Sequence, residues 1–218
     1  MSPLERFLDP AKVSLKICGV TLPTDANWLV SRGVDALGVN FWPRSKRFVE
    51  PGDARWLREF AGRVLRVGVF VNEPSALPLR LAKEGLIDVV QLHGDETPEQ
   101  VKVYQDAGIP FIKAIGVKTA ADLERAAGFG ANAILLDAHA PGIYGGTGET
   151  FDWNTAIEFM RENPDMPVIL AGGVVPANAS LAAHTVRPAA LDVASGVESS
   201  PGVKDIAKVD ELLIALDR

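Results

Sequence analysis

The chain has 218 residues, of which 47% are hydrophobic and 23% are charged, and its net charge at pH 7 is −6. This composition excludes a largely disordered chain, and the acidity together with the absence of a Lys/Arg-rich run argues against nucleic acid as a partner. The sequence has one cysteine, no signal-like segment and no run of about 18 apolar residues, so we expect a soluble, cytoplasmic protein with no membrane contact.

Short β-type apolar runs alternate with helix-like segments from residue 13 onwards. The runs predicted as strands are residues 13–17, 36–41, 65–71, 88–92, 110–116, 133–137, 167–171 and 190–194. The segments predicted as helices are residues 25–32, 51–61, 74–83, 97–107, 119–127, 153–160, 176–186 and 203–216. Proline near a first turn, or a Thr or Asp able to cap it, marks the start of several of these helices.

Eight strand–helix units in strict alternation predict parallel strands joined by right-handed crossovers. In about 200 residues they make a compact (β/α)8 TIM barrel of the α/β class. We expect one domain, with residues 1–12 as an N-terminal extension packed outside the barrel and residues 13–218 as the barrel. A doubly wound open sheet is the alternative that periodicity leaves open, but no dinucleotide fingerprint follows the first strand and no P-loop occurs.

Reactive groups of a TIM barrel gather where its strands end and in the loops that follow. Cys18 follows the first strand and Asp137 ends the sixth. A lone cysteine is often a small core side chain, but Lys16 shares its strand face and is expected to point into the barrel mouth. A buried lysine is costly unless it is paired or holds an anion, which favours a functional strand end. Whether Lys16 tunes the Cys18 thiol or meets an anionic group of a substrate stays open.

Other strand ends also carry polar residues or glycines. Arg47 lies in the loop after the second strand, and Gln91 and His93 share a face of the fourth, where a structural His93 is the alternative to a catalytic one. Two glycine-bearing loops after strands seven and eight favour a phosphate site over simple tight turns. Their residues are Gly172, Gly173, Ser195 and Gly196. The glycine-rich loop of residues 138–152 is either a cover over the site or merely solvated.

Seven motifs, taken together, are more specific than any of these features alone. They are KICGV (16–20), GVNFWPRSKRFV (38–49), VGVFVN (67–72), VQLHGDE (90–96), LLDAHAPGIYGGTGETFDW (135–153), LAGGVVPANA (170–179) and DVASGVESSPGVKD (192–205). In order and spacing they resemble the phosphoribosylanthranilate isomerase family. The resemblance covers nearly everything from Lys16 to Asp205.

The resemblance implies an enzyme of tryptophan biosynthesis. Such an isomerase carries out the Amadori rearrangement of N-(5-phosphoribosyl)anthranilate to the corresponding 1-deoxyribulose 5-phosphate, with no metal and no organic cofactor. It implies Cys18 as general base, Asp137 as general acid and Arg47 as the partner of the anthranilate carboxylate, with phosphate held after strands seven and eight. Ala194 stands where serine is more often expected, which removes one hydroxyl near the phosphate. The implied partner is this small-molecule substrate, and we expect a monomer or a homodimer.

This chemistry places opposite demands on the two groups. To act as a base, Cys18 needs thiolate character near neutral pH, and Lys16 is the candidate cause; to act as an acid, Asp137 needs a raised pKa.

Two alternative functions remain. The related isomerase of histidine biosynthesis relies on paired aspartates, whereas strand one here ends in cysteine. A phosphate-binding barrel without catalysis would need neither an acid nor a base.

Overall fold

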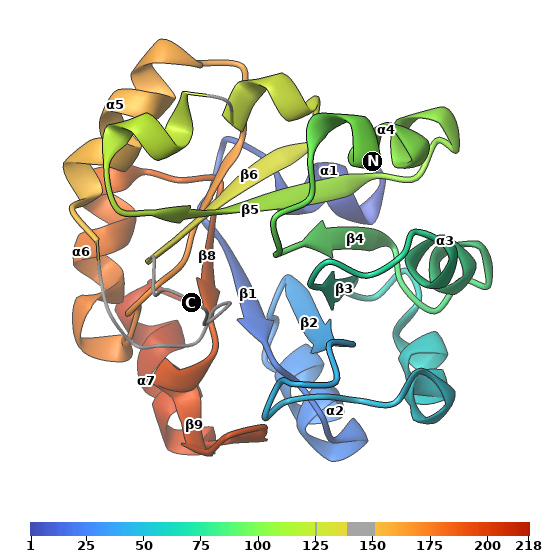
Figure 1. The fold of residues 1–218 in the computed structure, drawn as a ribbon. Coiled ribbons are helices and arrows are strands. Elements are labelled where there is room, and N and C mark those ends of the chain that lie inside the picture. The colour runs from blue at the N-terminus through green and yellow to red at the C-terminus, as the bar shows by residue number, and fades with distance from the viewer. Residues whose placement is uncertain (125, 139–150) are drawn as a thin grey trace.

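The computed structural model describes residues 1–124, 126–138 and 151–218. Eight parallel strands close into a barrel in chain order, and helices surround it (Figure 1). The strands are β1 (Ser14–Cys18), β2 (Ala36–Asn40), β3 (Leu65–Phe70), β4 (Val89–Leu92), β5 (Phe111–Val117), β6 (Ala133–Ala138), β7 (Val168–Leu170) and β8 (Ala190–Val193). Because β8 pairs with β1, no sheet edge is left, and the predicted TIM barrel is confirmed.

The connections are helical, but not all are α-helices. The α-helices between strands are α2 (Pro23–Ser31), α3 (Ala76–Lys83), α4 (Pro98–Asp106), α5 (Trp153–Glu162) and α6 (Pro176–Val186). The 3-10 segments are η1 (Pro51–Phe60), η2 (Ala120–Leu123) and η3 (Ala126–Phe129), where α-helices are predicted for residues 51–61 and 119–127. Gly52 and Asp53 in η1 and Gly128 in η3 are poor α-helix formers. In the described part of the chain, no helix is long and apolar enough to cross a membrane.

The chain after β8 differs most from the prediction of a helix over residues 203–216. A 3-10 turn, η4 (Ser195–Val197), leads into an antiparallel hairpin of β9 (Glu198–Ser200) and β10 (Val203–Lys204). The last helix, α7 (Ile206–Ala215), begins only after Asp205, whose side chain accepts hydrogen bonds from two backbone N–H groups of its first turn. This N-cap fixes the helix start and leaves Lys204 in the hairpin.

Strand alternation divides the core into two layers. Leu15 and Ile17 on β1 pack toward the helices, as predicted. The opposite strand faces fill the barrel with small and branched apolar side chains. These are Ala36, Leu65, Val67, Val89, Ile112, Ala114, Ala133, Leu135, Ile169, Ala171 and Ala190. Nearer the carboxyl ends of the strands the inward side chains become polar, and Lys16, Gln91, Asp137 and Asp192 are all buried.

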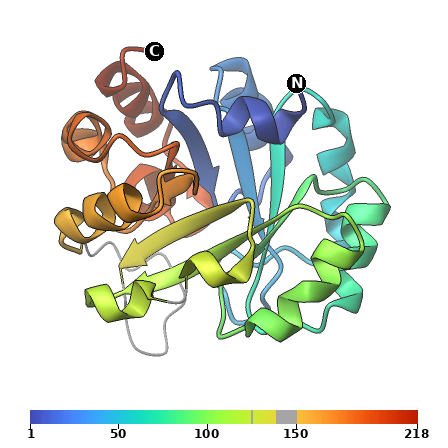
Figure 2. The same cartoon turned by 90° about the horizontal axis from the view of Figure 1, so that it is seen from above.

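The N-terminal segment forms a short helix, α1 (Pro3–Phe7), opened by a capping box between Ser2 and Glu5. It lies over the end of the barrel where the strands begin (Figure 2). Phe7 is 1% exposed and belongs to the same cluster as the apolar residues inside the barrel, with Leu4 and Leu8 packed beside it. The extension therefore contributes one side chain to the barrel interior, whereas the sequence predicts an arm packed outside the barrel.

Candidate active site

Cys18, the last residue of β1, shares the inward face of that strand with Lys16. Lys16 is fully buried, and its Nζ lies 2.8 Å from Oδ2 of Asp192, its register partner on the neighbouring strand β8. On the other side, Gly38 of β2 is the register partner of Cys18. A Cβ at position 38 would lie 2.8 Å from Sγ of Cys18 and 3.1 Å from Cε of Lys16. Glycine at position 38 thus lets the thiol and the lysine side chain occupy the same space beside β2.

Burial and neighbouring charges compete over the protonation of these groups. Burial raises the pKa of the Cys18 thiol; Lys16 opposes that rise, Asp192 adds to it, and the pKa of Cys18 lies above its ordinary value. Burial alone would lower the pKa of Lys16, but Asp192 and Cys18 outweigh it, and the pKa of Lys16 is raised. Lys16 therefore lowers the pKa of Cys18 in the expected direction, but in the free protein burial and Asp192 together exceed the effect of the lysine.

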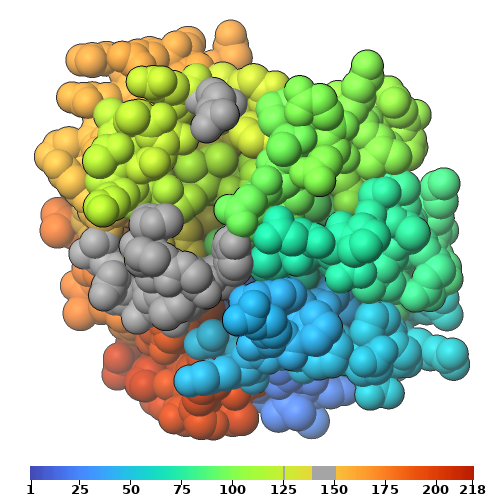
Figure 3. Space-filling view, viewed as in Figure 1, coloured from blue at the N-terminus to red at the C-terminus, as the bar shows by residue number. Residues whose placement is uncertain are grey.

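Arg47 lies beside Cys18 in a cluster of buried charges at the mouth. The loop that carries it meets the C-terminal hairpin on one face of the molecule (Figure 3). Nε and Nη2 of Arg47 donate to the two carboxylate oxygens of Glu198 at 2.8 and 2.6 Å. Lys204 donates 2.6 Å hydrogen bonds to Oε1 of Glu198 and to the backbone oxygen of Cys18. The stem of Arg47 passes over Gly19, whose φ of +72° and missing Cβ leave it room.

These contacts set the charge of the cluster. Arg47 and Lys204 are two cations against the one carboxylate of Glu198. The paired cations outweigh the effect of burial, and the pKa of Glu198 is lowered. Among the described residues, Nη1 of Arg47 has no hydrogen-bond acceptor, so one edge of the guanidinium faces away from Glu198. The cluster retains a positive charge and an open donor edge, which suits a carboxylate.

Across the mouth, Asp137 on β6 contacts His93, one of the two polar residues predicted on the fourth strand. Nε2 of His93 lies 3.3 Å from Oδ2 of Asp137, and Oδ1 accepts a 2.9 Å hydrogen bond from the N–H of Ala138. Nε2 of Gln91 lies 2.9 Å from Nδ1 of His93. With the amide donating to Nδ1, the ring proton is on Nε2 and faces the carboxylate. His93 is therefore placed against Asp137.

The loops after β7 and β8 touch one another. Gly172 and Gly173 have φ of +77° and +63°, and a Cβ at Gly172 would lie 2.9 Å from Oδ1 of Asp137. Gly196 has no room for a Cβ because the backbone oxygen of Val174 lies against it. Asn178 in the first turn of α6 donates a 2.9 Å hydrogen bond to the backbone oxygen of Gly173. The two predicted phosphate loops and the start of α6 are thus side by side.

The rest of the candidate site is limited by what the structure describes. The predicted cover over the site, residues 138–152, falls largely on residues 139–150, outside the described part of the chain. Within residues 1–124, 126–138 and 151–218, no group of three or more His, Cys, Asp or Glu side chains is arranged to hold a metal ion.

Comparison with known proteins connects this geometry to a family. The chain matches the sequence profile of the family described as N-(5′-phosphoribosyl)anthranilate (PRA) isomerase over residues 15–215. The chain belongs to the PRA isomerase family. A PRA isomerase from Trichlorobacter lovleyi is 40% identical over 202 residues, which are 92% of this chain and 96% of that protein. One from Thermotoga maritima is 43% identical over 194 residues, covering 88% and 93%.

Solved PRA isomerases have the same fold. A Thermotoga maritima crystal structure is 39% identical, with a TM-score of 0.85, and covers 94% of this chain and 98% of its own. A PRA isomerase in complex with reduced 1-(o-carboxyphenylamino)-1-deoxyribulose 5-phosphate has a TM-score of 0.81 at 38% identity, with the same coverage. The sequence resemblance to the PRA isomerase family is confirmed.

Three charged residues of this PRA isomerase family member were not singled out from the sequence. Asp192 follows Ala190 by two on β8 and so shares its inward face, the same signal that placed Lys16. Glu198 and Lys204 gave no such signal because the hairpin that holds them was not predicted. The contact between His93 and Asp137 joins strands far apart in the sequence, and the strand pattern gave no register between them.

Proposed function

We propose that this PRA isomerase uses Cys18 as general base and Asp137 as general acid in the Amadori rearrangement of N-(5-phosphoribosyl)anthranilate. The observation that carries the proposal is that these two side chains lie at the carboxyl ends of β1 and β6 of one barrel, on faces that line its mouth. Asp137 donates a proton to the ring oxygen as the anthranilate nitrogen forms the Schiff base. Cys18 then removes the proton from C2 to give the enolamine.

Arg47 binds the anthranilate carboxylate with the edge of its guanidinium that Glu198 leaves open. Glu198 holds Nε and one side of Nη2, so Nη1 and the other side of Nη2 form a second fork. Two cations against one carboxylate also leave the cluster attractive to an anion. Glu198 thereby orients Arg47 without cancelling the charge that the substrate needs.

The loops after β7 and β8 hold the substrate phosphate. The positive φ angles of Gly172 and Gly173 and the start of α6 supply backbone N–H groups at one place. Ser195 and Gly196 begin the adjoining loop, and Ala194 before them offers no hydroxyl. Recognition of phosphate here therefore depends mainly on backbone donors.

Substitution at the two reacting positions tests the proposal. Cys18→Ala and Asp137→Asn should each lower kcat at least about a hundredfold, the lower range for a general acid or base. Loss of anthranilate fluorescence measures the turnover. The matched control is Ser14→Ala, which removes a buried hydroxyl from the inward face of the same strand; this hydroxyl has no hydrogen-bond partner among the described residues. Both variants should still bind the reduced product analogue, which shows that they fold; near-normal turnover in either variant would overturn its assignment.

We also propose that the enzyme is cytoplasmic and acts as a monomer or a homodimer on this small-molecule substrate. A lone cysteine fits a reducing compartment. One structural neighbour, from Thermotoga maritima, is described as a monomeric form of a dimeric PRA isomerase. Sedimentation of the purified chain at several concentrations distinguishes the two states.

A further inference from the structure

The Lys16 ammonium lies in the barrel mouth between an aspartate and a thiol. It is bonded to Asp192 at 2.8 Å, while its Cε and the Cys18 sulfur are both about 3 Å from the empty Cβ position of Gly38. We propose that Asp192 is a positioning residue that competes with the Cys18 sulfur for the Lys16 ammonium, so that the thiol stays protonated until substrate occupies the mouth. This inference rests on the proposed role of Cys18 as the base.

Asp192 has one oxygen to spare. Oδ2 accepts from Lys16, whereas Oδ1 is buried and has no hydrogen-bond partner among the described residues. A buried carboxylate oxygen left without a donor strengthens the attraction of the whole group for its one cation. The same oxygen can accept a hydrogen bond from a hydroxyl of a bound sugar. Such a bond weakens the attraction of Asp192 for Lys16, so that the ammonium stabilises the thiolate more strongly.

The charges around the thiol support this competition. In the described part of the chain, the charged groups that face Cys18 are Lys16 on β1, Asp192 on β8, Lys204 on β10 and Arg47 in the loop after β2. Lys204 and Arg47 are both tied to Glu198, and Lys16 is tied to Asp192. No cation near the thiol is therefore free of a carboxylate partner. Burial and Asp192 both raise the pKa of Cys18, in the direction that the proposal requires.

The rate of thiol alkylation in the free enzyme measures how far Asp192 keeps Lys16 from stabilising the Cys18 thiolate. Cys18 is the only cysteine of the chain, so the rate of reaction with iodoacetamide against pH reports its thiolate alone. Asp192→Asn should raise the alkylation rate at pH 7 about tenfold, the change expected from one unit of pKa when a neighbouring charge is removed. The double variant Lys16→Met/Asp192→Asn should lose this gain, because the cation is gone as well. An Asp192→Asn rate that is unchanged or lower would overturn the inference.

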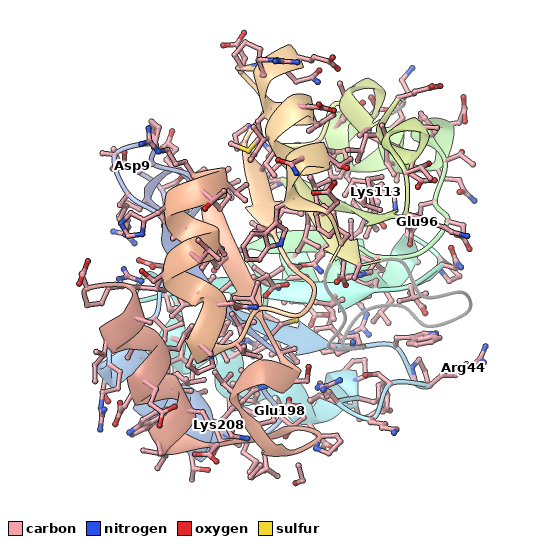
Figure 4. The ribbon with its side chains drawn as sticks, turned by 90° about the vertical axis from the view of Figure 1, so that its left-hand side faces the viewer. Asp9, Arg44, Glu96, Lys113, Glu198 and Lys208 are labelled. Atoms are coloured by element: carbon pink, nitrogen blue, oxygen red, sulfur yellow. The ribbon has the colours of Figure 1, made fainter. Side chains whose placement is uncertain are left out.

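A second buried ion pair serves as the control. Nζ of Lys113 lies 2.9 Å from Oε2 of Glu96, and both side chains are nearly as buried as Lys16 and Asp192. The pair lies well apart from the Glu198 cluster (Figure 4). Glu96→Gln should lower stability without changing the alkylation rate of Cys18. A rate increase in Glu96→Gln equal to that in Asp192→Asn would mean general loosening and would overturn the inference.

Kinetic pH profiles test the step that substrate causes. The acid limb of kcat/KM reports the base in the free enzyme, and that of kcat reports the base in the complex. In the unsubstituted enzyme the acid limb of kcat should lie at lower pH than the acid limb of kcat/KM. Asp192→Asn should reduce this difference in pH between the two limbs. Equal limbs in the unsubstituted enzyme would contradict the proposal. Alkylation needs no turnover, so an unchanged alkylation rate in Asp192→Asn would leave the role of Cys18 as base untouched. Normal turnover of Cys18→Ala would refute that role and would say nothing about the effect of Asp192 on the thiol.

Discussion

The two ends of the barrel differ in the kind of side chain that they bury. At the carboxyl end charged side chains are buried: Lys16 is paired with Asp192, and Glu198 is paired with Arg47. At the amino end the group that closes the barrel interior is the apolar Phe7. Buried ion pairs contribute little net stability because desolvation offsets their attraction, whereas apolar burial stabilises at about 25 cal/mol per Å². The comparison teaches that stability is supplied at one end and chemistry at the other.

Charges at the amino end are arranged differently as well. Asp35 accepts hydrogen bonds from the side chains of Lys12 at 2.7 Å and Arg218 at 2.6 Å, and from the N–H of Leu15 at 2.8 Å. It therefore ties Lys12, just before β1, and the C-terminal Arg218 to the first strand, and both chain ends lie at this end of the barrel (Figure 2). Each of its oxygens has a donor, unlike the orphaned Oδ1 of Asp192. A fully satisfied carboxylate serves stability, whereas an unsatisfied one is available for a ligand.

The largest effect on this comparison should come from Phe7→Ala. Removing a buried Phe costs about 3–5 kcal/mol of unfolding free energy, and urea denaturation measures it. Because Phe7 lies at the end opposite Cys18 and Asp137, kcat at a temperature where the variant is folded should change less than twofold. Ile214→Ala, at a side chain 72% exposed on α7, is the matched control and should leave both values unchanged. A lower kcat with normal stability would show that the two ends are coupled.

At the carboxyl end, Glu198→Gln should impair substrate binding, whereas Phe7→Ala at the amino end lowers stability. The variant loses charge-assisted hydrogen bonds to Arg47 and Lys204, so the guanidinium is less well oriented and KM should rise about tenfold with a smaller change in kcat. Ser199→Ala, at an exposed neighbour in the hairpin, is the control.

A double-mutant cycle sharpens this test. If Glu198 acts through the guanidinium, adding Glu198→Gln to Arg47→Met should raise KM little further. Fully additive KM effects would show that Glu198 acts on the substrate by another route.

Much of the fold follows from the sequence because the strands of a closed parallel barrel are buried on both faces. Apolar runs such as residues 65–71 and 133–137 therefore mark β3 and β6 to within a residue at either end. The 3-10 segments η1 to η3 have apolar patterns like those of α-helices, and the apolar pattern does not register the poor α-helix formers Gly52, Asp53 and Gly128 within them. The hairpin of β9 and β10 is too short to give a period, so residues 203–216 were predicted as one helix.

The site could be predicted in position but not in charge balance. The alternation rule placed Lys16 inside the barrel, and the same rule applied to β8 would have placed Asp192 opposite it. Lys16 favours the thiolate as expected, but burial and its partner Asp192 outweigh it, and the pKa of the thiol is raised. The bidentate contact between Arg47 and Glu198 joins the loop after β2 to the hairpin after β8, and the sequence pattern does not reveal that hairpin. The roles of the glycine loops in phosphate binding remain predictions.

The smallest effect should come from Asp35→Asn at the amino end. Hydrogen bonds from Arg218, Lys12 and Leu15 outweigh burial and lower the pKa of Asp35, so its contribution to stability is present above its unfolded-state pKa of about 3.9 and is lost as pH falls through the lower folded-state value. The variant should therefore be less stable than the unsubstituted chain by about 1 kcal/mol at pH 7, with the gap closing in strong acid. Chemical denaturation at several pH values measures the gap, and Asp53→Asn, at an exposed carboxyl in η1, is the control. Because Asp35 has no spare oxygen and lies far from the mouth, kcat and the alkylation rate of Cys18 should not change; a pH-independent gap would mean that the amide loses packing and not charge.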